Sequence, residues 1–331
     1  MDVPPEFLSA KLRGCRRRVY EGRRLRELAA CPNVEELGRR LYPREPVMGR
    51  LALERRLRQD CLDELSSFTY LLSEGFARFY TALLRRFQID NVLVLLRLFV
   101  GGREEPSPQR YLVKLPAAMA VPAGELLSSR DPDEFLARLP EDLAAAAAGA
   151  REIERQEGTT AFVEMALERA YWEQVVEALR GLPPAESAAC AAPVLCDLGA
   201  ARLLAVLRAG RQYELRWDRL QPLLPPWPAD LRPCPAVLMA DGRLAELHRD
   251  PSPARVTAML RFVRPQEAQS LPDLEDRLWK ETFRVANRLY YAMSEGRAIL
   301  VSYFYVRRNE LKALTKLVES VHYGRPPRTD A

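Results

Sequence analysis

Three glutamates at matching places in the chain could do acid–base chemistry. Glu54, Glu168 and Glu275 each follow a leucine, and the dipeptide Leu-Glu occurs nowhere else in the 331 residues. A carboxyl group held in an apolar site can serve as a general acid or base. A single chain rarely carries three copies of one catalytic acid, however. Because a buried carboxylate needs a partner, we expect each glutamate to form an intra-unit salt bridge or a helix-to-helix hydrogen bond.

Other catalytic and metal-binding patterns are missing from the sequence. It contains no GxxxxGK[ST] or GxGxxG phosphate loop, no HExxH zinc motif and no GxSxG nucleophile motif. His248 and His322 are the only histidines, too few for a histidine-based metal site, and both lie in segments predicted to be exposed. The sequence therefore predicts no catalytic residue, no metal, no cofactor and no small-molecule substrate.

The cysteines and arginines indicate structural rather than chemical roles. The six cysteines show no CxxC spacing, so we expect small core residues or incidental thiols rather than disulfides. Arginine supplies 45 of the 50 basic residues, and the densest run is Arg13–Arg26. That run could contact nucleic acid or anionic lipid. Acidic residues balance the rest of the chain, which favours a solvated face of the first helix and no nucleic-acid partner.

A repeated arrangement of helices positions the three glutamates. Downstream of each Leu-Glu pair lies a second helical segment with leucines in two aligned columns. These segments are Ile89–Phe99, Ala200–Gly210 and Arg308–Val318. The repeat-core residues are Leu53, Glu54, Leu93 and Leu96, then Leu167, Glu168, Leu204 and Leu207, then Leu274, Glu275, Leu311 and Leu314. The spacing predicts three repeats of about 110 residues, over 1–110, 111–220 and 221–331.

A short capped helix precedes each long Leu-Glu helix. Each one begins with a side chain typical of a helix start, in two cases followed by proline at the first helical position. The pairs are Asn33 with Glu36, Asp131 with Pro132, and Ser252 with Pro253. Ala, Leu, Arg and Glu dominate, and alternation typical of strands is scarce. The sequence predicts an all-α fold, in which Gln109–Ala123 alone could be a strand or irregular.

The long helix of the middle repeat is predicted to be largely buried. Arg169, Glu173 and Arg180 share one narrow polar stripe, and apolar residues cover most of the remaining surface of the helix. The next helix should pack against it, with Leu204 in an apolar site near Leu167. A carboxylate introduced at Leu204 would then be costly.

No segment is predicted to cross a membrane. The longest uncharged apolar runs, Leu143–Ala150 and Ser187–Cys196, are far shorter than the roughly 20 residues that span a bilayer. The N-terminal segment has its basic run after the apolar residues and lacks the hydrophobic core of a signal peptide. We therefore expect a cytosolic protein.

Three stretches carry a resemblance to one family, the C subunits of the bacterial and archaeal V-type (A-type) rotary ATPases, equivalent to the d subunit of the eukaryotic vacuolar enzyme. The stretches are AKLRGCRRRVYEGRRLREL, FVEMALERAYWEQVVEAL and FQIDNVLVLLRLF, the last through Ile89, Asp90, Asn91, Leu95, Leu96 and Arg97. The second copy of that last stretch departs from the pattern at Ala201 and Arg202. The third has Thr315 where Arg97 and Arg208 stand.

The resemblance implies a mechanical rather than a chemical function. Members of that family are three-lobed helical funnels with pseudo-threefold symmetry. The resemblance implies the same shape here, and no catalytic site in this chain. Such a rotor subunit sits on the membrane proteolipid ring and holds the central-stalk subunits D and F, for ATP-driven ion transport or ATP synthesis. It would be cytoplasmic and peripheral, touching the membrane only through the ring. An unrelated helical scaffold or adaptor, and a nucleic-acid-binding protein, are the alternative hypotheses.

Overall fold

The computed structural model describes residues 5–102, 107–228, 230–231, 241–250, 255–256, 260 and 270–324. Within these ranges every regular element is a helix, and no strand occurs. The predicted all-α class is therefore confirmed for the part of the chain that is described. The segment Gln109–Ala123 is irregular and contains the short 3-10 turn η3 (Ala117–Met119), just after η2 (Pro108–Arg110).

The helices alternate between short connecting elements and long ones. The first third contains α1 (Pro5–Arg16), α2 (Gly22–Ala29), α3 (Val34–Leu41), α4 (Arg50–Ser66), η1 (Thr69–Leu71), α5 (Glu74–Leu84) and α6 (Arg86–Val100). The middle contains α7 (Ala123–Leu127), α8 (Pro132–Ala137), α9 (Glu141–Glu157), α10 (Ala161–Arg180) and α11 (Pro184–Gln212). The last third contains α12 (Trp217–Leu220), η4 (Gln221–Leu223), α13 (Asp241–Arg249), α15 (Leu271–Ala292) and α16 (Gly296–His322).

Two of the predicted helix starts are confirmed. The Asn33 side chain accepts a hydrogen bond of 2.8 Å from the backbone N–H of Glu36 at the start of α3. Asp131 does the same for Glu134 at the start of α8, where Pro132 is the first helical residue. The third predicted start, Ser252 with Pro253, lies outside the described residues. Each cap satisfies a backbone donor that the helix itself leaves unpaired.

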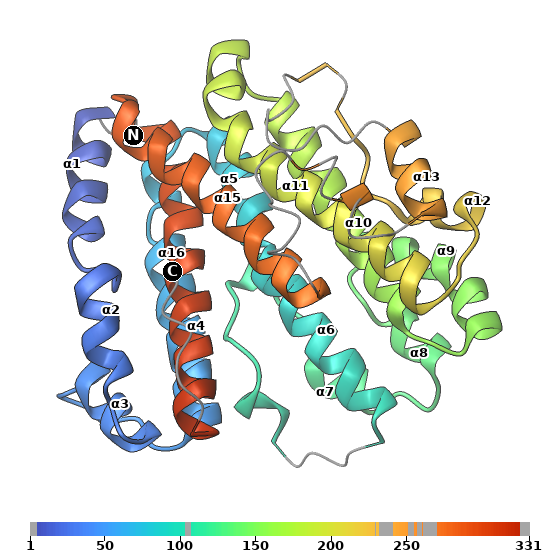
Figure 1. Ribbon diagram of the computed structural model, residues 1–331, viewed down its shortest axis with the longest axis horizontal. Helices are drawn as coiled ribbons and strands as arrows, with labels where there is room; N and C mark the ends of the chain where they lie inside the picture. Colours follow the sequence, from blue (N-terminus) through green and yellow to red (C-terminus); the bar gives the residue numbers. More distant parts are fainter. Residues whose placement is uncertain are drawn as a thin grey trace.

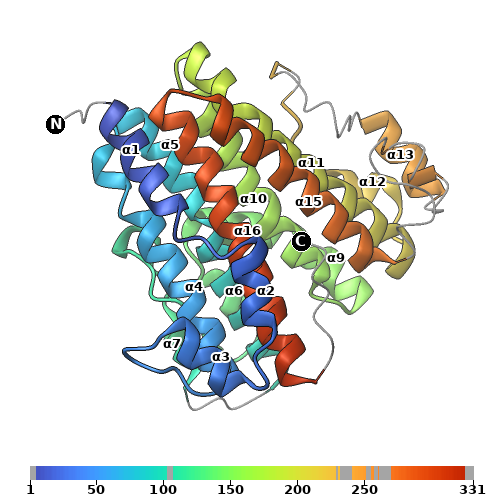
Figure 2. The ribbon, with the colours of Figure 1, turned by 60° about the vertical axis from the view of Figure 1, so that its left-hand side comes forward.

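Long helices form the body of the molecule (Figure 1). α16 packs beside both α4 and α15, α11 packs on α15, and α10 packs on α11. α1 lies along α16, as Figure 2 shows from another side. Three contacts join segments from successive predicted repeats: α6 on α10, α11 on α15, and α16 on α4. The third of these brings the C-terminal helix against the N-terminal region, so the contacts run around the molecule.

The central helices are buried as their patterns predict. In α10, Leu167 and Trp172 are almost completely inaccessible, whereas Arg169 and Glu173 form an ion pair in which each side chain is about two-fifths exposed. In α16, every residue from Ala298 to Val306 is buried. Burial of such long apolar surfaces means that tertiary packing, more than helix propensity, stabilises these helices.

Helix α11 bears on the expectation that no segment crosses a membrane. By length and composition alone it could cross a membrane, although 72% of its most apolar 18-residue window is buried within the protein. The sequence-based expectation considered only uncharged runs, which end at Asp197, but a helix can carry Asp197 and Arg202 and still be apolar overall. Because its apolar surface is covered by α10, α15 and α16, α11 serves as a core helix here.

The cysteines depart partly from expectation. Cys15, Cys31, Cys61 and Cys190 are buried free thiols, as predicted, and burial raises the pKa of the Cys61 thiol to about 11. Cys196, in contrast, is disulfide-bonded. The prediction that the cysteines are not used in disulfides is wrong for this residue, because sequence spacing does not reveal which thiols the fold brings together.

The basic run lies on two helices rather than one. α1 ends at Arg16 and α2 begins at Gly22, whose φ of +53° suits glycine. Arg17 and Arg23 are exposed, in agreement with a solvated face. Arg16 is the exception, because it is only 8% exposed and donates to Glu21 and Asn287.

Candidate functional site: a central charged cavity

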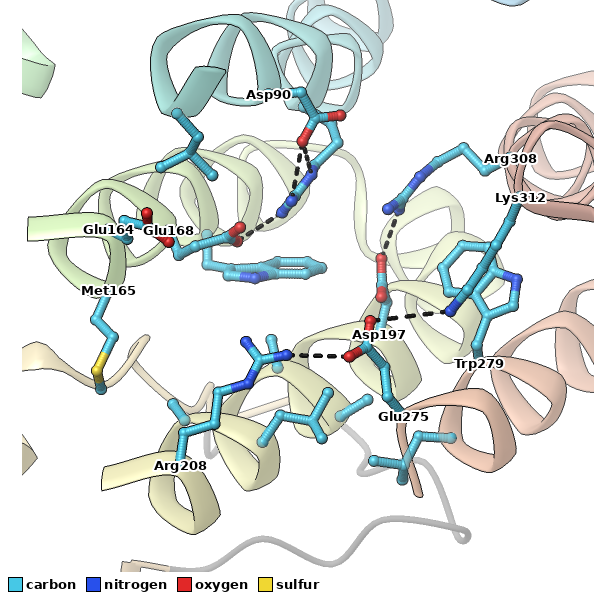
Figure 3. Close-up of a pocket in the computed structure, with 18 of the residues that line it drawn as sticks. Asp90, Glu164, Met165, Glu168, Asp197, Arg208, Glu275, Trp279, Arg308 and Lys312 are labelled. Atoms are coloured by element: carbon cyan, nitrogen blue, oxygen red, sulfur yellow. Dashed lines mark hydrogen bonds and ion pairs between the residues drawn. The ribbon is translucent and has the colours of Figure 1, made fainter. Parts of the chain in front are cut away.

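A cavity of about 940 Å³ lies among the long helices. Its wall combines two helices from each predicted repeat: α4 and α6, α10 and α11, and α15 and α16. Figure 3 shows side chains from several of these helices converging on the same space. A concave site built from elements of the whole chain is the natural place for a ligand or a partner.

The twelve predicted repeat-core residues divide between this cavity and the core. Six line the cavity: Glu54, Glu168, Glu275, Leu93, Leu204 and Leu311. The other six have at most 4% exposure: Leu53, Leu167, Leu274, Leu96, Leu207 and Leu314. Adjacent helical residues point about 100° apart, so each Leu-Glu pair buries its leucine while its glutamate reaches the cavity. The structure thus brings all three glutamates to one site.

Leu204 is the residue whose environment was predicted wrongly. Its helix does pack against α10, but Leu204 itself is only half-buried and lines the cavity. Leu207, one turn further on, is fully buried. Leu204 and Leu207 both belong to the wide apolar face of α11. Periodicity alone does not tell which part of that face packs against protein and which part borders a cavity.

The cavity wall carries both signs of charge. Its basic residues are Arg58, Arg86, Arg97, Arg208, Arg308, Lys312 and Lys316, and its acidic residues are Glu54, Asp90, Glu164, Glu168, Asp197 and Glu275. Trp172 and Trp279 are among the aromatic groups beside them. Most of these charges are compensated in pairs, so the wall is polar without carrying a large field of one sign.

Two ion-pair groups close the seam between α6 and α10. Arg86 Nη1 lies 2.6 Å from Glu168 Oε2, and Arg86 also pairs with Asp90 at 3.0 Å. Burial disfavours the charge on Arg86, but Asp90 and Glu168 outweigh it and hold the pKa of the guanidinium well above its ordinary value. Arg97 contacts both carboxylate oxygens of Glu164, at 2.9 and 2.8 Å. Glu168 thus forms a helix-to-helix hydrogen bond, one of the two expected kinds of contact, but its partner lies in the preceding predicted repeat rather than in its own.

The seam between α11 and the pair α15 and α16 is built in a similar way. Arg208 donates to Glu275 at 3.0 Å, and Arg308 donates to Asp197 at 2.8 Å (Figure 3). The Arg308 guanidinium also lies 4.8 Å from the centre of the Trp279 ring. Burial lowers the pKa of Lys312, although Glu275 and Asp276 oppose that effect.

The seam between α16 and α4 differs from the other two. Glu54 is only 9% exposed, and its Oε1 atom has no hydrogen-bond partner among the described residues. Arg50, one turn earlier on α4, forms an ion pair with that oxygen at 3.8 Å from its Nε atom, which is the salt bridge within the repeat that the sequence predicts, although it is too long for a hydrogen bond. Burial is the main cause that raises the pKa of Glu54, and Arg50 and Arg58 only partly counter it. Thr315 lines the cavity from α16.

Most charged side chains of the cavity wall are held in ion pairs. Among the described residues, no group of three or more His, Cys, Asp or Glu side chains is placed to hold a metal ion. His248 lies against Trp217 and His322 beside Tyr323, and neither is a cavity residue. Glu168, the candidate acid, is occupied by Arg86.

A family model described as the ATP synthase (C/AC39) subunit matches residues 8–329. The chain belongs to this family. No curated protein is a significant match to the chain. This match confirms the resemblance to the C subunits of V/A-type ATPases and to the d subunit of the vacuolar enzyme. The family consists of components of membrane-associated rotary ATPases.

The family segment Ile89–Arg97 forms the cavity side of α6. Asp90 and Arg97 reach the cavity, while Asn91 exchanges two hydrogen bonds with the backbone of Val113, at 2.8 and 3.1 Å. This C/AC39 motif therefore both lines the site and anchors the irregular segment behind it.

Sequence reasoning missed several residues of this site. They are Arg86, Glu164, Asp197, Trp279, Arg308 and Lys312. A signal was available in part, because Asp197 is seven residues before Leu204 and Arg308 three before Leu311, which places both on the same helical faces as those leucines. Which of these residues pair with each other could not be predicted, because the pairing depends on how the helices of the C/AC39 chain pack together.

Proposed function

We propose that the chain is a non-catalytic central-stalk subunit of a V/A-type ATPase rotor. It would couple a shaft of subunits D and F to the membrane proteolipid ring, for ion transport or ATP synthesis. Family membership supports a role in such a complex. The finer assignment rests on the central cavity, which would receive the foot of the shaft.

The dimensions and polarity of the cavity suit the end of a helical shaft. An α-helix with its side chains is roughly 10 Å across, so 940 Å³ corresponds to about two turns. Helix ends expose unpaired backbone groups and charged side chains. The wall offers complementary groups, and Trp172 Nε1 and Glu54 Oε1 are buried there without hydrogen-bond partners among the described residues. An apolar ligand would leave those groups unpaired.

The packing of the helices also supports three units arranged around the cavity. Each of the seams α6 with α10, α11 with α15, and α16 with α4 joins one predicted repeat to the next. Units over residues 1–110, 111–220 and 221–331 that pack in this way would form the three-lobed funnel. A closed set of mutual contacts gives the stiffness that transmission of torque requires.

The same proposal assigns the surroundings of the protein. It would lie on the cytoplasmic face of the membrane as a peripheral subunit, with membrane contact only through the proteolipid ring. The basic run does not favour a nucleic-acid partner, because Arg16 is buried and Arg18 and Arg23 pair with Glu64 and Glu27.

Reconstitution tests this assignment. The full chain, mixed with purified subunits D and F and with detergent-solubilised proteolipid ring, should elute from size exclusion as a complex of defined mass. A folded, monodisperse chain that retains neither the D–F pair nor the ring would refute the rotor function and leave the fold untouched. A helical scaffold of another kind would give that result.

A further inference from the structure

The cavity seams share one electrostatic device. At the seam of α6 and α10, Arg97 near the end of α6 reaches Glu164 at 2.8 Å. At the seam of α11 and α15, Arg208 near the end of α11 reaches Glu275 at 3.0 Å. Arg97 and Arg208 occupy the same column of the predicted repeat alignment. In both places an arginine of one helix neutralises a carboxylate on the long helix beside it. That carboxylate is Glu164, one turn before the Leu-Glu column, in the first case and Glu275, within the column, in the second.

The third seam has the carboxylate but lacks the arginine. Thr315 of α16 stands in the column of Arg97 and Arg208, and both Thr315 and Glu54 line the cavity. Arg58 donates from its Nε atom to the backbone oxygen of Glu54, at 3.4 Å, rather than to the carboxylate. Arg50 forms an ion pair with Glu54 along α4, but its Nε atom lies 3.8 Å from Glu54 Oε1, which is longer than a hydrogen bond.

The surroundings of Glu54 favour an additional cation. Its side chain is about nine-tenths buried, yet its Oε1 atom accepts no hydrogen bond from the described residues. The charged and titratable groups that act on it are Arg50 and Arg58 on α4 and Glu319 and His322 on α16. Glu319 is a second carboxylate and raises the cost of the charge on Glu54. Buried carboxylates in this situation are normally paired with a cation.

We propose that a lysine or arginine side chain of the shaft subunits enters the cavity and pairs with Glu54, in the place of the arginine that α16 lacks. This inference rests on the proposed function. The described residues provide no cluster of three or more metal ligands, so the occupant is an ammonium or guanidinium group rather than a metal ion. Only the seam of α16 and α4 would accept such a group. A shaft that carries this cation on one side would therefore bind in a single rotational orientation.

Two substitutions test the pairing from opposite sides. Glu54→Gln removes the acceptor charge at nearly constant volume and should weaken binding of the purified D–F pair by about tenfold, mainly through faster dissociation. Thr315→Arg supplies the missing arginine within the chain. It should raise the melting temperature and weaken D–F binding to a similar extent, because the carboxylate is then already occupied. When Thr315→Arg is added to Glu54→Gln, the double variant should show no gain in melting temperature over Glu54→Gln alone.

Glu173→Gln is the matched control, because Glu173 on α10 is partly exposed and does not line the cavity. It should bind D–F like the wild-type chain. The cationic partner is then identified by changing each lysine and arginine at the foot of the shaft to alanine. For one of them, the loss of affinity should vanish when the chain carries Glu54→Gln.

The outcomes separate this inference from the proposed function. If the wild-type chain binds D–F but Glu54→Gln and Thr315→Arg bind it equally tightly, Glu54 has no cationic partner and the inference is overturned, while the rotor function stands. If the folded wild-type chain does not bind D–F at all, the proposed function fails and the pairing with it.

Discussion

Arg86 Nη1 lies 2.6 Å from Glu168 Oε2, although the two residues are 82 positions apart in the chain. The pair joins α6 to α10 and so connects two predicted repeats. Asp90 shares the same guanidinium at 3.0 Å, so Arg86 pairs with two carboxylates at once. Removal of the arginine therefore leaves more uncompensated charge than removal of either acid.

We expect Arg86→Ala to lower the free energy of unfolding by about 2 kcal/mol. A fully buried pair would lose more, but the side chains of Arg86 and Glu168 keep 20% and 27% exposure. Urea unfolding followed by circular dichroism measures the change. Glu173→Ala, which breaks the exposed pair with Arg169, is the control and should cost no more than about 0.5 kcal/mol. Equal losses in the two variants would show that the seam pair does not stabilise the fold.

Helical periodicity identified six residues that prove to line the cavity, but neither the cavity itself nor the ion pairs inside it. The Leu-Glu dipeptide places Leu167 in the core and Glu168 one step around the helix, a relationship that follows from helix geometry alone. That Glu168 meets Arg86 depends on the packing of α6 against α10. Local spacing predicts partners three or four residues away, and it is silent on partners from another helix.

Burial along α11 shows the same limit. Leu204 and Leu207 are equivalent in any apolar pattern, yet the first lines the cavity and the second is fully buried. Which part of a wide apolar face meets a cavity is decided by the neighbouring helices. The disulfide at Cys196 likewise depends on tertiary proximity that spacing in the sequence does not encode.

The two leucines of α11 give a second test. Leu207→Asp places a carboxylate in a fully buried apolar site and should lower the free energy of unfolding by about 3 kcal/mol or more. The carboxylate introduced by Leu204→Asp would face the polar cavity, within reach of water and of cations such as Arg208. This substitution should lower the free energy of unfolding by about 1 kcal/mol. Thermal unfolding of both variants gives the comparison. A larger loss for Leu204→Asp would contradict the cavity assignment.

Isolated protein should not hydrolyse ATP. Its sequence lacks a phosphate-binding loop, and the described cavity residues include no metal cluster. A coupled assay with highly purified chain, with and without magnesium, should give rates equal to the buffer blank. Steady hydrolysis that a single substitution in this chain abolishes would contradict a purely mechanical subunit.

The buried carboxylate of Glu54, which has only a long ion pair with Arg50, predicts a distinct pH dependence of stability. Its pKa in the folded chain is raised, mainly by burial, whereas in the unfolded chain it is about 4.3. The folded state therefore binds the Glu54 proton more tightly, and the stability contributed by that proton is lost as the pH rises through the folded pKa. Above that pH the charged carboxylate disfavours folding. Below about pH 4 both states are protonated and the penalty is absent.

Glu54→Gln should accordingly melt at a higher temperature than the wild-type chain at about pH 7.5, and the difference should shrink steadily as the pH is lowered toward about 4. Glu319 and His322, which also act on Glu54, are present in both proteins, so their own titration largely cancels in the difference. Addition of the D–F pair at neutral pH should reverse the order, because a cation paired with Glu54 stabilises only the wild-type complex. A difference in melting temperature that does not vary with pH would mean that Glu54 is charged at no cost in the folded chain, and the third seam would then need no outside partner.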